Sequence, residues 1–138
     1  MMKRVAVNPS EWGLQWQMNQ AEVVEGLTRT LHCSGQVALK ADENSEMGVS
    51  VVHAGDMRGQ ITESLVNIDA ILEKADMKRE NILSLRFFTT DVDRFIENYD
   101  VYAGWIADAG IMPPQTLLGV SRLALPELMI EIEATAGS

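Results

Sequence analysis

The sequence predicts an α+β fold in which two helices pack on one face of a single mixed β-sheet. Two segments, 57–75 and 92–109, carry apolar residues at helical spacing, and short apolar runs typical of strands precede, separate and follow them. The predicted order is β-β-β-α-β-α-β-β, which places both helices on the same side of one sheet. A chain of 138 residues has the usual size of one domain, so we assign residues 1–138 to a single domain.

The first twenty residues predict one strand followed by an irregular loop. Residues 3–7 are predicted as a short strand that Asn8-Pro9 ends, because this pair is typical of a turn. Residues 10–20 show no regular period. We therefore expect a loop here, and it carries Trp12 and Trp16.

The next thirty residues predict two strands and a polar loop. Segments 21–27 and 28–34 have the composition of strands, and Gly26 between them indicates a hairpin turn. Residues 40–50 are rich in Asp, Glu, Asn, Ser and Gly, which are typical of a surface loop.

The first helix is predicted from one apolar stripe of about five turns, with Asp56 as its N-cap. Its members recur every three or four residues, as one helix face requires: Met57, Ile61, Leu65, Ile68, Leu72 and Ala75. A strand at 82–90 follows. Asp91 then caps a second helix, which Gly110 ends. The stripe of this helix comprises Phe95, Tyr99, Tyr102, Ile106 and Ala109.

Two apolar runs, 115–123 and 128–136, predict the last two strands. Side chains alternate along a strand, so Glu131 and Glu133 share one face and Ile130 and Ile132 share the other. Two carboxylates inside so apolar a strand are explained either by a solvent-exposed face or by a functional site, because unpaired carboxylates are rarely buried.

The face of the sheet without helices would be exposed in a lone subunit. We therefore expect the chain to associate with copies of itself through that face. The net charge of −9 repels phosphate backbones and counts against nucleic acid as a partner.

Composition also sets expectations for location and cofactors. No apolar run approaches the length of a membrane span, and the N-terminus lacks the apolar segment of a secretory signal. One cysteine, Cys33, permits no intrachain disulfide, which fits the cytoplasm. Two isolated histidines, His32 and His53, form no metal motif, and we expect no metal and no other cofactor.

Three C-terminal motifs resemble the RidA/YjgF family, the reactive-intermediate (enamine/imine) deaminases and their relatives. They are Pro113–Val120, Arg122–Ala124 and Ile130–Ala134. Upstream, the resemblance includes Ser34-Gly35-Gln36, a helix containing Gln60, Leu65, Asn67 and Ile71, and Thr90-Asp91. It covers roughly residues 28–136. It implies a chorismate-mutase-like fold and a homotrimer with its sheets facing inward. Small-molecule pockets are then expected at the subunit interfaces.

The resemblance also implies a set of site residues. Glu131 matches the glutamate that positions the water, and Ser34 and Gly35 match residues that line the pocket. The position of the family's cysteine is Leu117, whose backbone carbonyl keeps the cysteine's role of holding the water. A tyrosine of the family aligns with Met18 and an asparagine with Tyr99.

One central position departs from the family. Its arginine, which grips the carboxylate of substrates derived from amino acids, is Gln115 here. Glutamine carries no charge, and a charge-assisted bidentate pair is roughly twice as strong as a neutral hydrogen bond. Gln115 suits an amide, a carbonyl or the edge of a heterocycle better than a carboxylate, and it is equally compatible with an ordinary polar residue at the start of a strand.

Alternatives remain open for the charged residues. Glu131 is either the proton-transfer group of a pocket or a structural carboxylate paired with Arg122 or Arg86. Arg86 either supplies the missing positive charge or forms an ion pair with an acid.

Two functions follow from these assignments. The first is a trimeric enamine/imine hydrolase that acts on a substrate outside the usual 2-aminoacrylate class. The second is a trimer that binds a small-molecule ligand without catalysis. Family members described as nucleases or translation inhibitors suggest a third function, which the acidic charge disfavours.

Overall fold

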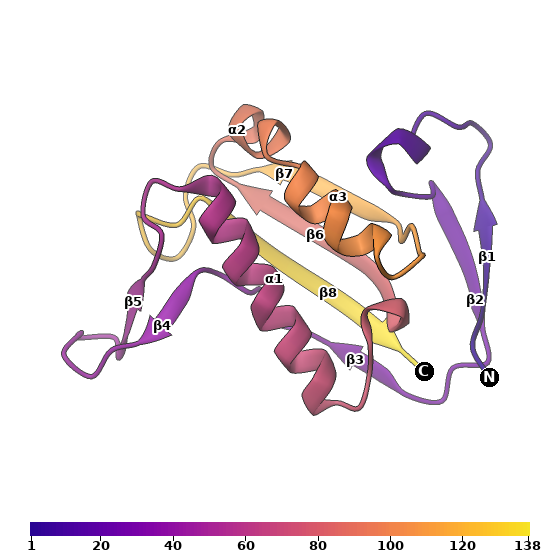
Figure 1. The fold of residues 1–138 in the computed structure, drawn as a ribbon, viewed down its shortest axis with the longest axis horizontal. Coiled ribbons are helices and arrows are strands. Elements are labelled where there is room, and N and C mark those ends of the chain that lie inside the picture. Colours follow the sequence, from indigo (N-terminus) through magenta and orange to yellow (C-terminus); the bar gives the residue numbers. More distant parts are fainter.

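The structure, a computed structural model that describes residues 1–138, is built on a four-stranded mixed sheet. Its strands lie in the order β3 (Thr30–His32), β8 (Ile130–Gly137), β6 (Ile82–Thr89) and β7 (Gln115–Gly119). β8 runs antiparallel to both of its neighbours, whereas β6 and β7 are parallel. The helices lie on one face of this sheet (Figure 1), which confirms the predicted layering.

The first helix, α1 (Met57–Lys74), begins where the sequence predicts. The Asp56 carboxylate accepts a hydrogen bond from the Gly59 N–H at 3.0 Å, as an N-cap does. The second predicted helix is divided into α2 (Val92–Glu97) and α3 (Asp100–Ala107) at Asn98 and Tyr99. The Asp91 carboxylate caps α2 by accepting from the Arg94 N–H at 3.1 Å.

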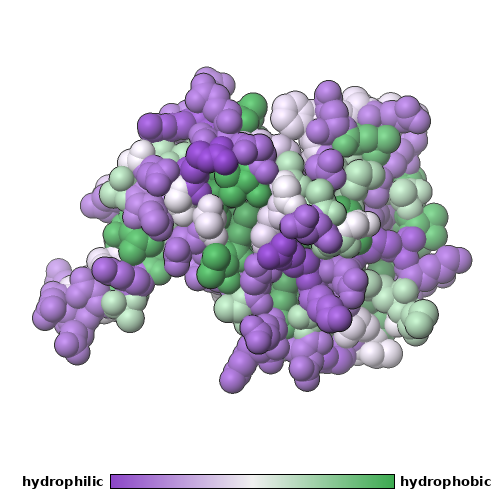
Figure 2. All heavy atoms as spheres, viewed as in Figure 1, coloured by the Kyte–Doolittle hydropathy of each residue, from purple (hydrophilic) through white to green (hydrophobic).

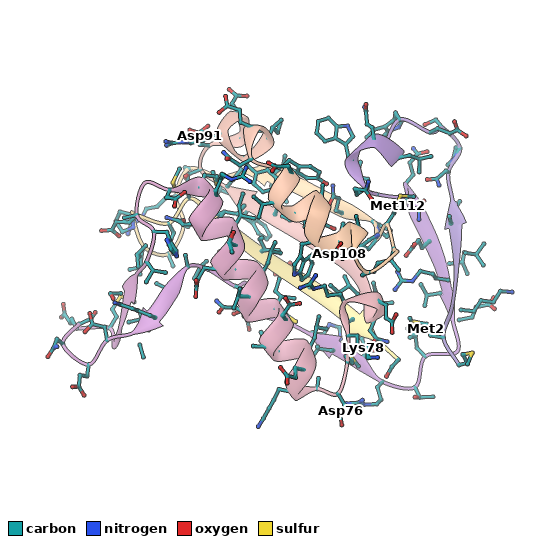
Figure 3. All side chains as sticks on the ribbon, viewed as in Figure 1. Met2, Asp76, Lys78, Asp91, Asp108 and Met112 are labelled. Carbon is teal, nitrogen blue, oxygen red and sulfur yellow. The ribbon has the colours of Figure 1, made fainter.

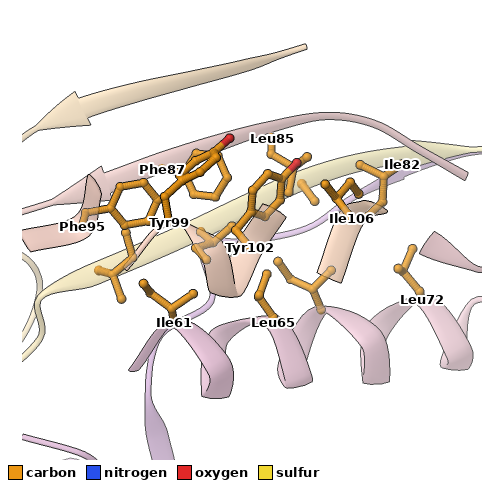
Figure 4. Packing of buried hydrophobic residues seen from close by; sticks show 14 of the residues in the cluster. Ile61, Leu65, Leu72, Ile82, Leu85, Phe87, Phe95, Tyr99, Tyr102 and Ile106 are labelled. Carbon is orange, nitrogen blue, oxygen red and sulfur yellow. The ribbon is translucent and has the colours of Figure 1, made fainter. Parts of the chain in front are cut away.

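The core lies between these helices and the sheet (Figure 4). Three aromatic rings join the second stripe to β6. Phe87 packs edge-on against Tyr102, with ring centroids 4.8 Å apart, and lies 5.3 Å from Phe95. Burial of aromatic rings of this size contributes much of the stability of a small core. The apolar face that was predicted for one helix thus continues from α2 into α3, across the break between them.

Two hairpins stand outside the four-stranded sheet. The strand predicted at Lys3–Val7 is present as β1, but it pairs with β2 (Ala21–Glu25). The predicted hairpin of segments 21–27 and 28–34 is therefore wrong, because the second of its strands joins β8 instead. Gly26, at a φ of +81°, turns the chain from one ladder to the other.

The hairpin of β1 and β2 lies beside the segment that connects α3 to β7. The backbone N–H of Asn19 donates to the carbonyl of Met112 at 2.8 Å, and Figure 3 labels Met112 at this point. The 3₁₀ turn η1 (Leu14–Trp16) lies within the irregular loop between the two strands. These contacts hold that loop close to the edge strand β7.

The second hairpin corrects another expectation. Residues 40–50, predicted as a loop, include most of β4 (Leu39–Ala41) and β5 (Val49–Val51), which pair antiparallel. β-Branched Val49 and Val51 favour a strand, and only the residues between the two strands are the polar turn that composition indicates. The hairpin projects from the molecule with a hydrophilic tip (Figure 2).

Gln60 fastens α1 to the segment that leads into β8. Its side chain is fully buried, and its amide nitrogen donates to the carbonyls of His53 and Glu127 at 3.1 and 2.9 Å. Its amide oxygen accepts from the Met129 N–H at 2.8 Å. One side chain thus satisfies three backbone groups.

A further 3₁₀ turn, η2 (Arg79–Asn81), leads directly into β6.

We predict that Gln60→Leu lowers the free energy of unfolding by about 3 kcal/mol, because it leaves buried backbone groups without partners. Urea titration measures this change. Ser64→Ala is the matched control, since Ser64 is equally buried one turn away but its hydroxyl donates only to the carbonyl of Gln60 in its own helix. Equal losses in the two variants would contradict the role given to Gln60.

Candidate functional site

A cavity of about 360 Å³ opens on the helix side of β7. It lies between that strand, the break between α2 and α3, and the irregular loop that follows β1. Its walls are mainly apolar and contain no charged side chain: Trp12, Trp16, Met18, Phe87, Ile96, Tyr99, Gln115, Thr116 and Leu117. Cavities of this size and composition are typical of small-molecule sites.

A chain of hydrogen bonds crosses the wall of this cavity. The amide nitrogen of Gln115 donates to the hydroxyl of Tyr99 at 2.5 Å, and that hydroxyl donates to the backbone carbonyl of Trp16 at 2.5 Å. Burial raises the pKa of Tyr99 to about 12, so the hydroxyl keeps its proton at neutral pH. The chain links the first residue of β7 to the loop that carries Trp16.

The orientation of the Gln115 amide follows from these bonds. The single proton of the Tyr99 hydroxyl is used on Trp16, so its oxygen can only accept from Gln115. The amide nitrogen of Gln115 therefore points at Tyr99. The amide oxygen is buried and has no hydrogen-bond partner.

Glu131 lies on the other face of the sheet. It stands opposite Phe88 in the ladder between β6 and β8, whereas its neighbours Ile130 and Ile132 are buried under the helices. Its carboxylate packs against Gly35, where a Cβ atom would overlap the carboxylate oxygen. A larger residue at position 35 would therefore displace the Glu131 carboxylate from this position.

The electrostatics of Glu131 favour its protonated form. Burial, and secondly the charge of Glu133, raise the pKa of the Glu131 carboxyl above its ordinary value. The carboxylate forms no ion pair within the chain, so the alternative of a structural pair with Arg122 or Arg86 is wrong for the single subunit. Arg122 donates instead to the carbonyl of Leu123.

Arg86 is paired, as the second of its two predicted roles requires. Its guanidinium donates to the Glu133 carboxylate at 3.0 Å, and the two residues face each other across β6 and β8. The Arg86 side chain is about two thirds exposed (66%), so the pair contributes little to stability. The positive charge that the family's arginine would supply is absent from the cavity walls.

The predicted site residues therefore form two groups on opposite faces. Gln115, Leu117, Tyr99 and Met18 line the cavity on the helix side. Glu131 and Gly35 touch on the face without helices, and Ser34 is the exposed neighbour of Gly35. Within one chain the sheet separates Glu131 from Gln115.

Sequence reasoning placed Trp12 and Trp16 in a loop but gave them no role. Both line the cavity, together with Ile96 on α2. The sequence did contain one indication of this role. Two tryptophans lie within five residues in a segment without helical or strand periodicity, so no regular element explains why such large apolar side chains occur there.

The remaining reactive side chains offer little chemistry. Burial raises the pKa of the Cys33 thiol, which disfavours the nucleophilic thiolate. No group of three His, Cys, Asp or Glu side chains is arranged to hold a metal ion. No helix combines the length and the apolar character needed to cross a membrane.

Comparison with known proteins supports the family resemblance that the C-terminal motifs indicate. The family model described as endoribonuclease L-PSP matches residues 18–138. The chain belongs to the RidA/YjgF family. One relative, a RutC family protein of Aquifex aeolicus, is 35% identical over 117 residues, which are 84% of this chain and 86% of the relative. Protein mmf2, mitochondrial, of Schizosaccharomyces pombe is 29% identical over 137 residues, or 98% of each chain.

Solved structures of the RidA/YjgF family share the fold. The Rid protein YyfB of Yersinia pestis superposes with a TM-score of 0.76 at 29% identity, covering 98% of both chains. The YjgF gene product of Escherichia coli gives a TM-score of 0.65 at 26% identity, again over 98% of both. The chorismate-mutase-like arrangement of helices and mixed sheet is thus confirmed.

The raised pKa of Glu131 predicts a pH dependence of stability. The folded chain keeps a proton that the unfolded chain releases near the ordinary pKa, so the free energy of unfolding falls as the pH rises from that value through the higher folded one. Glu131→Gln cannot titrate. Its melting temperature relative to the wild type should therefore be higher at about pH 7 than at about pH 4.

Melting temperatures of both proteins across this range test the sign. Glu43→Gln, in the exposed turn between β4 and β5, is the control and should show no such trend. A relative melting temperature of Glu131→Gln that stays level or falls with pH would show that the Glu131 carboxylate is not disfavoured by folding.

Proposed function

We propose that the protein is a homotrimer whose small-molecule sites are completed between subunits. The main observation in support is that the sheet of one chain separates the two groups of candidate site residues. A neighbouring copy that packs against the face without helices can bring its Gln115 and Leu117 toward Glu131, Ser34 and Gly35 of the first. The uncovered sheet face and the family fold support this assembly.

The reaction that fits these groups is hydrolysis of an enamine or imine. An enamine first takes a proton at carbon and gives up a proton from nitrogen, and so becomes an imine. Water then adds to the imine carbon while the C=N electron pair moves to nitrogen, which takes a proton. The resulting carbinolamine releases ammonia and leaves a carbonyl product.

Glu131 is the group that we assign to these proton transfers. Burial raises the pKa of the Glu131 carboxyl above its ordinary value, which favours a group that donates a proton to nitrogen and accepts one from water. Its carboxylate has no competing partner in the chain, so it is free to bind a water molecule. The backbone carbonyl of Leu117 from the neighbouring copy is the proposed second acceptor for that water.

The substrate differs from that of relatives that hold an arginine. Gln115 offers no charge, and one of the two N–H groups of its amide is already used on Tyr99. A free carboxylate would lose a charge-assisted pair and meet no replacement cation among the cavity residues. We therefore assign a substrate without a carboxylate at this position.

A second candidate function is ligand binding without catalysis. The bond between Gln115 and Tyr99 favours it, because the anchoring position has become part of a structural network. Ligands recovered unchanged after they raise the melting temperature would support this function.

Ammonia release from a panel of enamines, with and without a carboxylate, tests the proposal. We expect the neutral members to be hydrolysed and Glu131→Gln to lower their turnover by about 100-fold or more, the usual contribution of a general acid–base group. Glu43→Gln, in the exposed turn between β4 and β5, is the control, because it removes a carboxylate far from the proposed site and should retain full activity. Turnover unchanged in Glu131→Gln would remove its assigned role.

Replacement of the anchoring position gives a separate prediction. Gln115→Arg should introduce or raise ammonia release from 2-aminoacrylate-type substrates by about tenfold or more, because it restores a charged bidentate partner for their carboxylate. Gln115→Met, similar in length but unable to form hydrogen bonds, should bring no gain. If the arginine variant is no better, the missing charge is not what excludes these substrates.

A further inference from the structure

We infer that the cavity beside β7 binds an uncharged, flat aromatic molecule, and that Trp12 and Trp16 determine this preference. The inference rests on the proposed small-molecule function and specifies its ligand class. It follows from the shape of the walls, from the absence of charge and from the way in which Gln115 is held.

The walls favour a flat aromatic ligand. Trp16 and Tyr99 form a T-shaped aromatic pair, with ring centroids 5.5 Å apart and planes at 80°, and both rings line the cavity. Trp12 is more than half exposed (57%) at the mouth of the same cavity. An exposed indole beside an apolar cavity gains from stacking on a planar partner.

A negative charge is disfavoured at this site. None of the nine lining residues is charged, so an anionic ligand would lose its hydration and gain no counter-ion. The donor end of the Gln115 amide is turned to Tyr99, and its unpartnered oxygen is an acceptor. A carboxylate has only acceptor oxygens, so it cannot form a hydrogen bond with the amide oxygen of Gln115.

The cavity volume limits the size of the ligand. A volume of about 360 Å³ is near the lower end of the range for small-molecule sites, and it is sufficient for a bicyclic ring system. The side chains of Met18 and Leu117 can adjust around such a ring, because neither is locked by a hydrogen bond. Indole is therefore a suitable probe.

Calorimetric titration with three probes tests the preference. Indole is flat and neutral, indole-3-carboxylate adds a charge to the same ring system, and cyclooctanol is neutral but not flat. We expect indole to bind at least tenfold more tightly than either of the other two. Equal or tighter binding of indole-3-carboxylate, or no binding of indole at millimolar concentration, would overturn the inference.

Two kinds of variant test which residues cause the preference for indole. Trp12→Leu and Trp16→Leu keep apolar walls, and the latter keeps the backbone carbonyl that accepts from Tyr99. Each should weaken indole binding about fivefold or more, whereas Met47→Leu in the projecting hairpin should leave it unchanged. Gln115→Arg should reverse the order of indole and indole-3-carboxylate by adding a counter-ion.

The same measurements separate this inference from its alternatives. If Trp12 is instead covered by a neighbouring copy, Trp12→Leu will change the mass of the assembly by light scattering and leave indole binding intact, which would overturn it. Because binding is measured without turnover, it can be repeated in Glu131→Gln. If indole binds but no enamine releases ammonia, only the catalytic proposal is refuted. If neutral enamines release ammonia but flat aromatic molecules are not preferred, only the proposed ligand class is refuted.

Discussion

The alternation of side chains along β8 is the constraint on which the rest of the structure depends. Ile130, Ile132 and Ala134 are buried under the helices, so Glu131 and Glu133 must face the other way. A shift of one residue would expose the core and bury two carboxylates. The fold therefore fixes the position of the candidate acid with the same contacts that stabilise the core.

This constraint separates the two groups of candidate site residues. Gln115 at the start of β7 shares the helix side with Tyr99, while Glu131 shares the opposite side with Gly35. No rotation of a side chain can join groups across a hydrogen-bonded sheet. A site that uses both groups would have to draw on two subunits, and the proposed assembly rests on this requirement.

Much of the fold was predictable because it depends on local rules. Asp56 and Asp91 cap helices in the structure as their sequence context predicts, and the stripe that includes Phe95 and Tyr102 is buried. The pairing of β2 with β1 was not predictable in this way, since strand partners distant in sequence leave no local signal. Gly26 indicated a turn correctly but not which ladder each strand joins.

The candidate site was predictable only in part, for a similar reason. Alignment with family motifs found Glu131 and Gln115, and their face assignments follow from period-two alternation once the strands are placed. The wall formed by Trp12 and Trp16 depends on a long-range bond from Tyr99 to the loop. Such a bond is invisible to periodicity and to short motifs.

Cross-linking between subunits tests the shared site most directly. In a Cys33→Ser background, Ser34→Cys places one thiol beside Gly35 and Leu117→Cys places the other on β7, at two residues exposed in the single chain. With a short bismaleimide, the account predicts covalent dimers and trimers from the double variant, and a single-chain band from either single variant. A double variant that stays a single chain, at concentrations where both thiols react, would contradict the account.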